Sequence, residues 1–196
     1  KLLMRFYDVT GGSIRIGGHD VREFDRDDLR SMVGMVLQDT WLFKGSIREN
    51  IRYGRPDASD AEVEAAARAA RCDHFIHTLA GGYDFMINEE GTNLSQGQRQ
   101  LVTIARAILA DRPALILDEA TSALDSVTEV KIQHAFDELA RGRTTLVIAH
   151  RLSTIRSADR ILVVENGRIA EQGSHEALLA QNGEYASLWR TQNGKA

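Results

Sequence analysis

The order of apolar and polar positions predicts alternating strands and helices along most of the chain. Apolar residues recur at helical spacing from Leu101 to Leu109, which predicts one long amphipathic helix over 96–110. That helix leads into four consecutive apolar residues, 114–117, a run typical of a strand buried inside a parallel sheet. Further strands are expected at 13–16, 32–37, 144–148, 161–164 and 168–172, and helices at 27–31, 126–140 and 152–155 and from His175 and Glu184. The alternation predicts an α/β fold with a parallel core.

The stretch between residues 44 and 94 has a different character, because short helices replace the alternation of strands and helices. Helices are expected at 46–51, 60–70 and 73–79. The second of them opens on Ser59-x-x-Glu62, the sequence of a capping box. We therefore expect a helical lobe inserted between strands of the sheet.

The first residues, Lys1 to Tyr7, are rich in apolar side chains and have no helix-start signal before them. This pattern is typical of a sequence entered in the middle of a helix, and we expect Lys1 to be a cut rather than a natural beginning. No apolar run approaches the ~20 residues that a membrane-spanning helix needs. Any membrane role must come through a partner or through a segment outside these residues.

Composition narrows the classes of function. The formal net charge is −4 and the basic residues are scattered rather than clustered, which disfavours binding to nucleic acid. The single cysteine, Cys72, excludes an internal disulfide framework and is consistent with a reducing compartment. Cys72, His74 and His77 lie close enough in sequence for a zinc site, but a fourth ligand is not evident.

Two acidic residues, Asp118 and Glu119, follow the buried strand at 114–117. The carboxyl ends of strands are where open α/β sheets bind their ligands. A carboxylate at Asp118 is suited to bind Mg²⁺ through its water shell, and Glu119 to accept a proton from an attacking water. The alternative is that both residues merely end a strand as solvated side chains.

Ser95 stands directly before the long helix, where it is a good N-cap with Gln98 completing a capping box. Capping does not explain Gly97, since a glycine at the second helical position lowers helix stability. Close approach of a phosphate to the free N–H groups at the helix N-terminus explains it. The alternative is a plain capped helix that tolerates a glycine.

These motifs in their order resemble the ATP-binding cassette (ABC) nucleotide-binding domain. Leu94-Ser95-Gln96-Gly97-Gln98 resembles the signature sequence, and Asp118-Glu119 with the segment through Asp125 resembles the Walker B motif and D-loop. Gln38 resembles the Q-loop glutamine, and His150 resembles the switch histidine. The resemblance covers essentially the whole chain and implies a P-loop NTPase-like, RecA-type parallel sheet with an inserted helical subdomain. It implies one partial ABC domain over 1–196, with 1–38 and 111–196 as the catalytic α/β core and 44–110 as the helical subdomain.

The resemblance also implies a role for each matching residue. Asp118 and Gln38 would attend Mg²⁺, Glu119 would orient and deprotonate water, and His150 would contact the γ-phosphate of ATP. The signature residues would serve ATP held by a second nucleotide-binding domain, identical or different, in a head-to-tail dimer with ATP at the interface. The residues assigned to this contact are Ser95, Gln96, Gly97, Gln98 and, crossing the interface, Asp125.

The chain departs from the family pattern in two ways. Gln96 stands where the commonest signature has glycine, a variant familiar among exporters. The aromatic A-loop and the Walker A loop, G-x-x-x-x-G-K-[ST], are absent from these residues. Because that loop supplies most phosphate contacts, we expect this chain alone not to turn over ATP.

The segment from Asp39 to Ile51 is similar to the corresponding segment of multidrug and lipid exporters. Within it, Trp41, Leu42 and Phe43 are either ordinary core or a hydrophobic seat for a helix of a transmembrane domain, and in an exporter they would be some of both. Glu89-Glu90-Gly91 resembles the exporter X-loop, although Asn88 and Glu89 differ from its usual wording.

This branch of the family implies a transmembrane domain fused upstream and a location at the cytoplasmic face of the cell membrane. Two alternatives remain open. One is a remnant or regulatory module that keeps the fold but binds no nucleotide, and the other is a soluble ABC ATPase acting on DNA or ribosomes.

Overall fold

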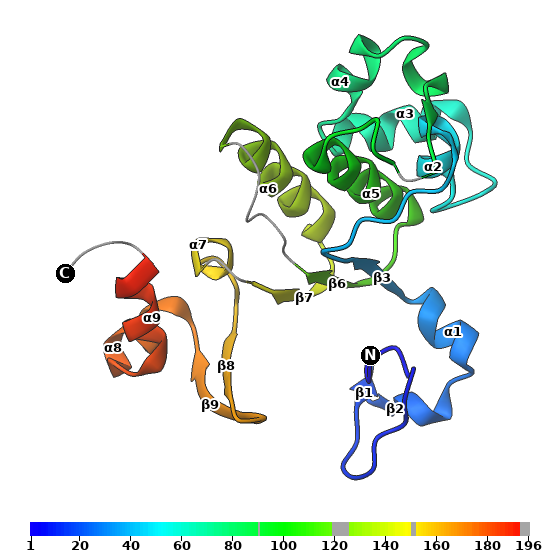
Figure 1. Ribbon diagram of the computed structural model, residues 1–196. Helices are drawn as coiled ribbons and strands as arrows, with labels where there is room; N and C mark the ends of the chain where they lie inside the picture. Colours follow the sequence, from blue (N-terminus) through cyan, green and yellow to red (C-terminus); the bar gives the residue numbers. More distant parts are fainter. Residues whose placement is uncertain (90, 119–125, 150–151, 193–196) are drawn as a thin grey trace. The chain divides into compact units, whose positions relative to one another are not determined.

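The computed structural model describes residues 1–89, 91–118, 126–149 and 152–192 (Figure 1). The chain forms two compact units, Lys1–Leu146 and Val147–Ala196, and each is described by itself. Of the helices in these ranges, none has the length and apolar character needed to cross a bilayer.

A small parallel sheet lies in the first unit. Strand β3 (Val33–Val36) pairs in parallel with β6 (Ala114–Asp118), so that Val36 lies opposite Leu117. Strand β7 (Thr144–Ile148) completes the strand order β3-β6-β7. The run of apolar residues in β6 is buried from Leu115 to Leu117, as expected of a strand covered on both faces. The predicted parallel core is confirmed, although β3 is shorter than the predicted 32–37.

Helix α5 (Gln96–Ala110) is the centre of the helical part, and its bounds are those predicted. It packs against α2 (Ile47–Arg52), α3 (Asp60–Ala69) and α6 (Ser126–Ala140) (Figure 1). Because neighbouring helices cover several sides of α5, its buried residues are not confined to one face. They include Val102, Ile104 and Ala105.

The other elements of the first unit are short. They are β1 (Arg15–Ile16), β2 (His19–Asp20), η1 (Val21–Glu23), α1 (Arg26–Ser31), β4 (Gly45–Ser46), α4 (Asp73–Thr78), η2 (Gly82–Asp84) and β5 (Met86–Ile87). The strand predicted at 13–16 is reduced to β1, which pairs with β2 across Gly17-Gly18. Both glycines have positive φ, 58° and 87°, which is the backbone that a two-residue hairpin turn requires.

The first residues form no helix of their own but have the hydrogen bonds with which a helix ends. Residues 2–5 form a single turn in which the N–H of Arg5 donates to the carbonyl of Leu2 at 3.0 Å. The N–H of Phe6 donates to the carbonyl of Lys1 at 3.1 Å, and Arg5 has φ 49°, in the left-handed region, so the turn closes as the C-terminal end of a helix does. Its guanidinium donates to the carbonyl of Phe24 at 3.0 Å, so the turn is held by contacts with a distant segment.

The second unit contains α7 (Leu152–Ile155), β8 (Ile161–Glu165), β9 (Arg168–Gly173), α8 (His175–Gln181) and α9 (Glu184–Gln192). β8 and β9, which cover the strands predicted at 161–164 and 168–172, form an antiparallel hairpin through Asn166-Gly167. A small core joins the hairpin to the helices through Ile161, Leu178 and Tyr185. The Tyr185 hydroxyl and His175 Nδ1 are hydrogen bonded at 2.8 Å inside it.

Candidate functional site

Gln38 and Asp118 leave the sheet at the same edge. Because β3 and β6 are parallel and Val36 lies opposite Leu117, the residues that follow each strand emerge side by side. Gln38 is exposed and Asp118 is partly buried at the last position of β6. An amide oxygen and a carboxylate are hard oxygen ligands of the kind that Mg²⁺ takes in proteins. The residues at this edge therefore fit the metal that the sequence predicts there.

The N-terminus of α5 is closed by the predicted capping box. The Gln98 N–H donates to Ser95 Oγ at 3.2 Å, and the Ser95 N–H donates to Gln98 Oε1 at 2.9 Å. Ser95 and Gln96 are exposed, whereas Gly97 is buried in the first turn of the helix. The reciprocal bonds occupy two N–H groups, and those of Gln96 and Gly97 have no intrahelical acceptor because they lie in the first turn.

The remaining predicted site residues, Glu119, Asp125 and His150, lie outside the described residues. Of the predicted set, the structure therefore brings Gln38 and Asp118 to one sheet edge and gathers Ser95, Gln96, Gly97 and Gln98 at one helix end. The roles assigned to all of these residues stay predictions.

The segment from Asp39 to Ile51, which resembles that of exporters, is partly buried and partly exposed, as the sequence suggested. Leu42 is in the core, whereas the Trp41 side chain is 60% exposed. Trp41, Phe43 and Tyr53 form an aromatic cluster in which the ring centroids lie 5.7 to 6.2 Å apart. The rings of Trp41 and Tyr53 thus present an exposed aromatic surface beside α2.

Arg106 is a structural residue of this region that the sequence analysis missed. It extends from α5, and its guanidinium donates to the carbonyl of Asn50 at 2.8 Å, to Asn50 Oδ1 at 3.0 Å and to the carbonyl of Trp41 at 3.1 Å. The same group lies over the rings of Trp41 and Tyr53. Burial lowers the pKa of Arg106.

A signal for Arg106 was present in the sequence. Val102, Arg106 and Leu109 share one face of α5, so an arginine stands inside an apolar stripe. Such a position is costly for a charge unless the group is hydrogen bonded. The burial of Asn50, its main partner, has no comparable sequence signal.

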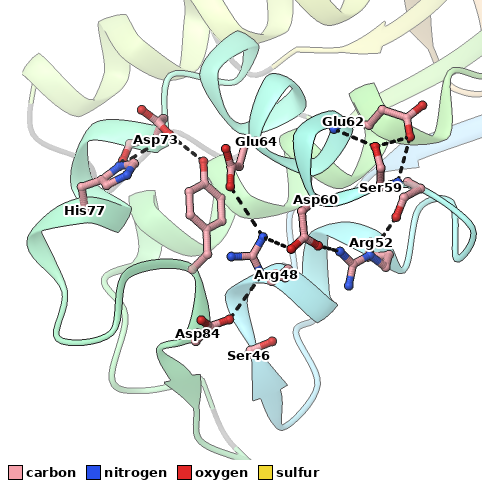
Figure 2. A network of polar contacts seen from close by, with 12 residues as sticks. Ser46, Arg48, Arg52, Ser59, Asp60, Glu62, Glu64, Asp73, His77 and Asp84 are labelled. Carbon is pink, nitrogen blue, oxygen red and sulfur yellow. Dashed lines mark hydrogen bonds and ion pairs between the residues drawn. The ribbon is translucent and has the colours of Figure 1, made fainter.

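Arg48 is the centre of a polar network that holds the helical lobe together (Figure 2). Its guanidinium makes ion pairs with Asp60 at 3.2 Å and Glu64 at 3.7 Å on α3, and with Asp84 of η2 at 3.2 Å. It also lies over the ring of Tyr83, with Cζ 5.2 Å from the ring centroid. The Arg48 side chain is only 19% exposed, so this shared cation joins α2, α3 and η2 more firmly than isolated surface pairs would.

Cys72 and His77, which were considered as zinc ligands, instead form hydrogen bonds with backbone carbonyls. The Cys72 thiol is fully buried and lies 3.3 Å from the carbonyl of Ala67, as its donor. His77 Nδ1 lies 2.9 Å from the carbonyl of Asp73. Across the part of the chain that the structure describes, no group of three or more potential ligand side chains is placed to hold a metal.

Comparison with known proteins finds relatives that match almost the whole length of the chain. The family model described as "ABC transporter" matches residues 1–122. The chain is 54% identical over 190 residues to a fatty acid ABC transporter ATP-binding/permease protein of Mycobacterium tuberculosis, covering 97% of this chain and 30% of that protein. It is also 54% identical over 192 residues to an ATP-dependent lipid A-core flippase of Syntrophus aciditrophicus, covering 98% of this chain and 32% of the flippase.

A solved structure agrees with these relatives. A bacterial Atm1-family ABC exporter with ATP bound matches the whole chain with a TM-score of 0.92 and 48% sequence identity, over 34% of its own length. This match confirms the predicted α/β fold of the P-loop NTPase class. The chain spans about a third of the length of the relatives that it matches.

Proposed function

The chain belongs to the ABC transporter family, and from that premise we propose that it is the ATP-binding and ATP-hydrolysing domain of an exporter. In this proposal ATP-driven dimerisation of two such domains powers transport across a membrane. The observation that carries the proposal is the parallel pairing of β3 with β6, which delivers Gln38 and Asp118 to one edge of the sheet. Relatives named for lipid and fatty acid transport support the exporter branch.

Each site residue has a distinct task in the proposed reaction. Asp118 and Gln38 hold Mg²⁺, which, when bound with ATP, neutralises charge on the phosphates during transfer to water. Glu119 orients the attacking water and takes its proton, a contribution of about 10²–10⁴ in rate. His150 contacts the γ-phosphate and so makes the site responsive to the loss of that group.

The signature residues serve the nucleotide of the opposing domain. The N-terminus of α5 carries a partial positive charge of about half an elementary unit, together with the unsatisfied N–H groups of Gln96 and Gly97. Ser95 and Gln98, fixed by their reciprocal bonds, present this end in a set geometry. Asp125 extends across the same interface, so closure depends on a γ-phosphate that hydrolysis removes.

The proposal includes the division of the chain into subdomains and a transmembrane partner. We assign 1–38 and 111–196 to the catalytic core and 44–110 to the helical subdomain with the signature. The exposed rings of Trp41 and Tyr53, held by Arg106, form a seat for a helix of the transmembrane domain. The ATPase domain then lies at the cytoplasmic face of the cell membrane.

The test is ATPase activity in a longer protein that contains both this segment and a G-x-x-x-x-G-K-[ST] loop upstream of it. Glu119→Gln is expected to lower kcat about 100-fold or more while ATP still binds, because only the proton acceptor is lost. Glu165→Gln, on the exposed end of β8, is the matched control and should retain full activity.

The 196-residue chain measured alone should show no robust turnover, since it lacks the loop that grips the phosphates. Unchanged kcat in Glu119→Gln would contradict the catalytic assignment. A longer protein that binds no ATP at all would instead favour the regulatory module over the ATPase.

A further inference from the structure

A cavity of about 830 Å³ lies among four helices of the first unit. One wall comes from the face of α5 that carries Ser95, and another from the face of α6 that carries Lys131. The end of α3 and the start of α4 supply Arg68, Arg71 and Asp73. Its volume is in the range of small-molecule sites, and its lining includes neither Gln38 nor Asp118.

The charges around this cavity are unbalanced. Arg68, Arg71 and Lys131 all line it, and Asp73 is the only carboxylate among the lining residues that the structure describes. Asp73 already accepts a hydrogen bond from the Tyr83 hydroxyl at 2.6 Å and lies 3.5 Å from His77 Nδ1. The Asp73 carboxylate therefore interacts with Tyr83 and His77 of the helical lobe, and among the described residues it makes no ion pair with the three cations.

Two of the three cations have no ion-pair partner within the described ranges. Arg68 lies 3.9 Å from Glu64, at the limit of an ion pair. Arg71 and Lys131 make no such contact, and both are exposed. They lie sixty positions apart in the sequence, yet both line this one cavity.

We propose that this cavity is a binding site for a phosphate-bearing anion, with Arg71 and Lys131 as its main ligands. An arginine guanidinium offers a planar set of donors that matches phosphate oxygens, and a lysine ammonium adds a compact charge opposite it. Ser95 and Gln98 also line the cavity, and both already have their place in the proposed function. The new assignment concerns the three cations, which that function does not use.

The chemistry of the ligand allows two sources. One is a free polyphosphate or phosphorylated metabolite. The other is the triphosphate of a free nucleotide such as ATP. Both present the same phosphoryl oxygens to Arg71 and Lys131.

The experiment is calorimetric titration of the 196-residue chain with inorganic tripolyphosphate in the absence of Mg²⁺ and nucleotide. The test variant is Arg71→Asn with Lys131→Gln. Asn is chosen because Arg71 has φ 58°, a left-handed backbone that Asn adopts more readily than most residues. The control is Arg15→Ala, which removes an exposed cation outside the cavity.

We expect the unaltered chain and the control to bind tripolyphosphate with similar Kd, and the double variant to bind it about 10-fold more weakly or worse. Raising the salt concentration from about 50 to about 200 mM should weaken binding by the unaltered chain. Circular dichroism of the double variant establishes that it is folded. No binding by the unaltered chain, or equal Kd for the folded double variant, would overturn the proposal.

Further titrations separate the sources and the competing classes of partner. Comparable Kd values for tripolyphosphate and ATP support a free phosphate ligand, whereas ATP binding that is at least 10-fold tighter than tripolyphosphate binding, and is weakened in the double variant, supports a nucleotide source. Equal affinity for an oligoglutamate peptide, or binding only to phosphatidylglycerol vesicles, would overturn the phosphate assignment. Since none of these measurements involves turnover or Glu119, their failure is distinguishable from failure of the proposed ATPase function.

Discussion

Gly54 lies just after α2 and directly against the backbone of α5. A Cβ atom placed on this residue would lie 2.2 Å from the carbonyl oxygen of Arg106 and 3.1 Å from its carbonyl carbon. These are backbone atoms of a buried helix, so they do not move aside as the end of a side chain would. The absence of a side chain at Gly54 therefore permits Arg106 to reach Asn50 and Trp41.

Gly54→Ala is expected to destabilise the chain by about 1–3 kcal/mol, the usual range for overpacking a well-packed region. The free energy of unfolding in urea measures the effect. Gly11→Ala is the matched control, because a Cβ there meets nothing within 4 Å. Equal losses in both variants would mean that glycine flexibility, rather than the contact with Arg106, explains the result.

At the scale of single elements, two helices of the lobe begin with the same device. In α2 the N–H of Ser46 donates to Glu49 Oε2 at 2.7 Å, and in α3 the N–H of Ser59 donates to Glu62 Oε2 at 2.8 Å. These backbone hydrogen bonds lower the pKa of both glutamates, with the serine hydroxyls adding to the effect. The ionised form of each glutamate is therefore the one that stabilises the helix start.

This arrangement predicts a specific acid sensitivity. Because the pKa of Glu49 and Glu62 is lowered on folding, their contribution is complete above the unfolded value of about 4.3 and is lost as the pH falls below it. The double variant Glu49→Gln/Glu62→Gln should lose less thermal stability between pH 6 and pH 3 than the unaltered chain. Thermal unfolding followed by circular dichroism gives Tm, and Glu165→Gln is the control. An identical fall in Tm for the double variant would contradict the prediction.

How well the sequence predicted each element depends on where its determinants lie. Helices 96–110 and 126–140 were predicted with their observed bounds, because apolar spacing and, at Ser95, a local cap specify them. The left-handed turn at Arg5 was not predicted, because it is held by the carbonyl of Phe24, a contact that no local pattern records. The same limit applies to the ligands of Arg106, since Asn50 lies 56 positions away.

At the scale of the whole molecule, the order of the motifs identified the family over essentially the full chain. The family match and the exporter structure agree with that order. The sheet edge was predictable because Gln38 and Asp118 each follow an apolar strand. The basic cavity was not, because Arg71 and Lys131 come to line one cavity only when α3 and α6 both pack against α5.

Because Cys72 is buried, the rate at which its thiol reacts reports how often the surrounding helices unfold. Burial raises the pKa of this thiol, and only the thiolate reacts quickly with alkylating agents. Iodoacetamide should therefore modify the folded chain far more slowly than the denatured chain, at a rate set by opening of α3 and α4. Moving the only thiol to the exposed face of α3, with Cys72→Ala and Ala61→Cys, should make alkylation immediate in the folded state. Mass spectrometry of the alkylated chain would then measure how often this part of the helical lobe opens, with the chain's own thiol as the probe.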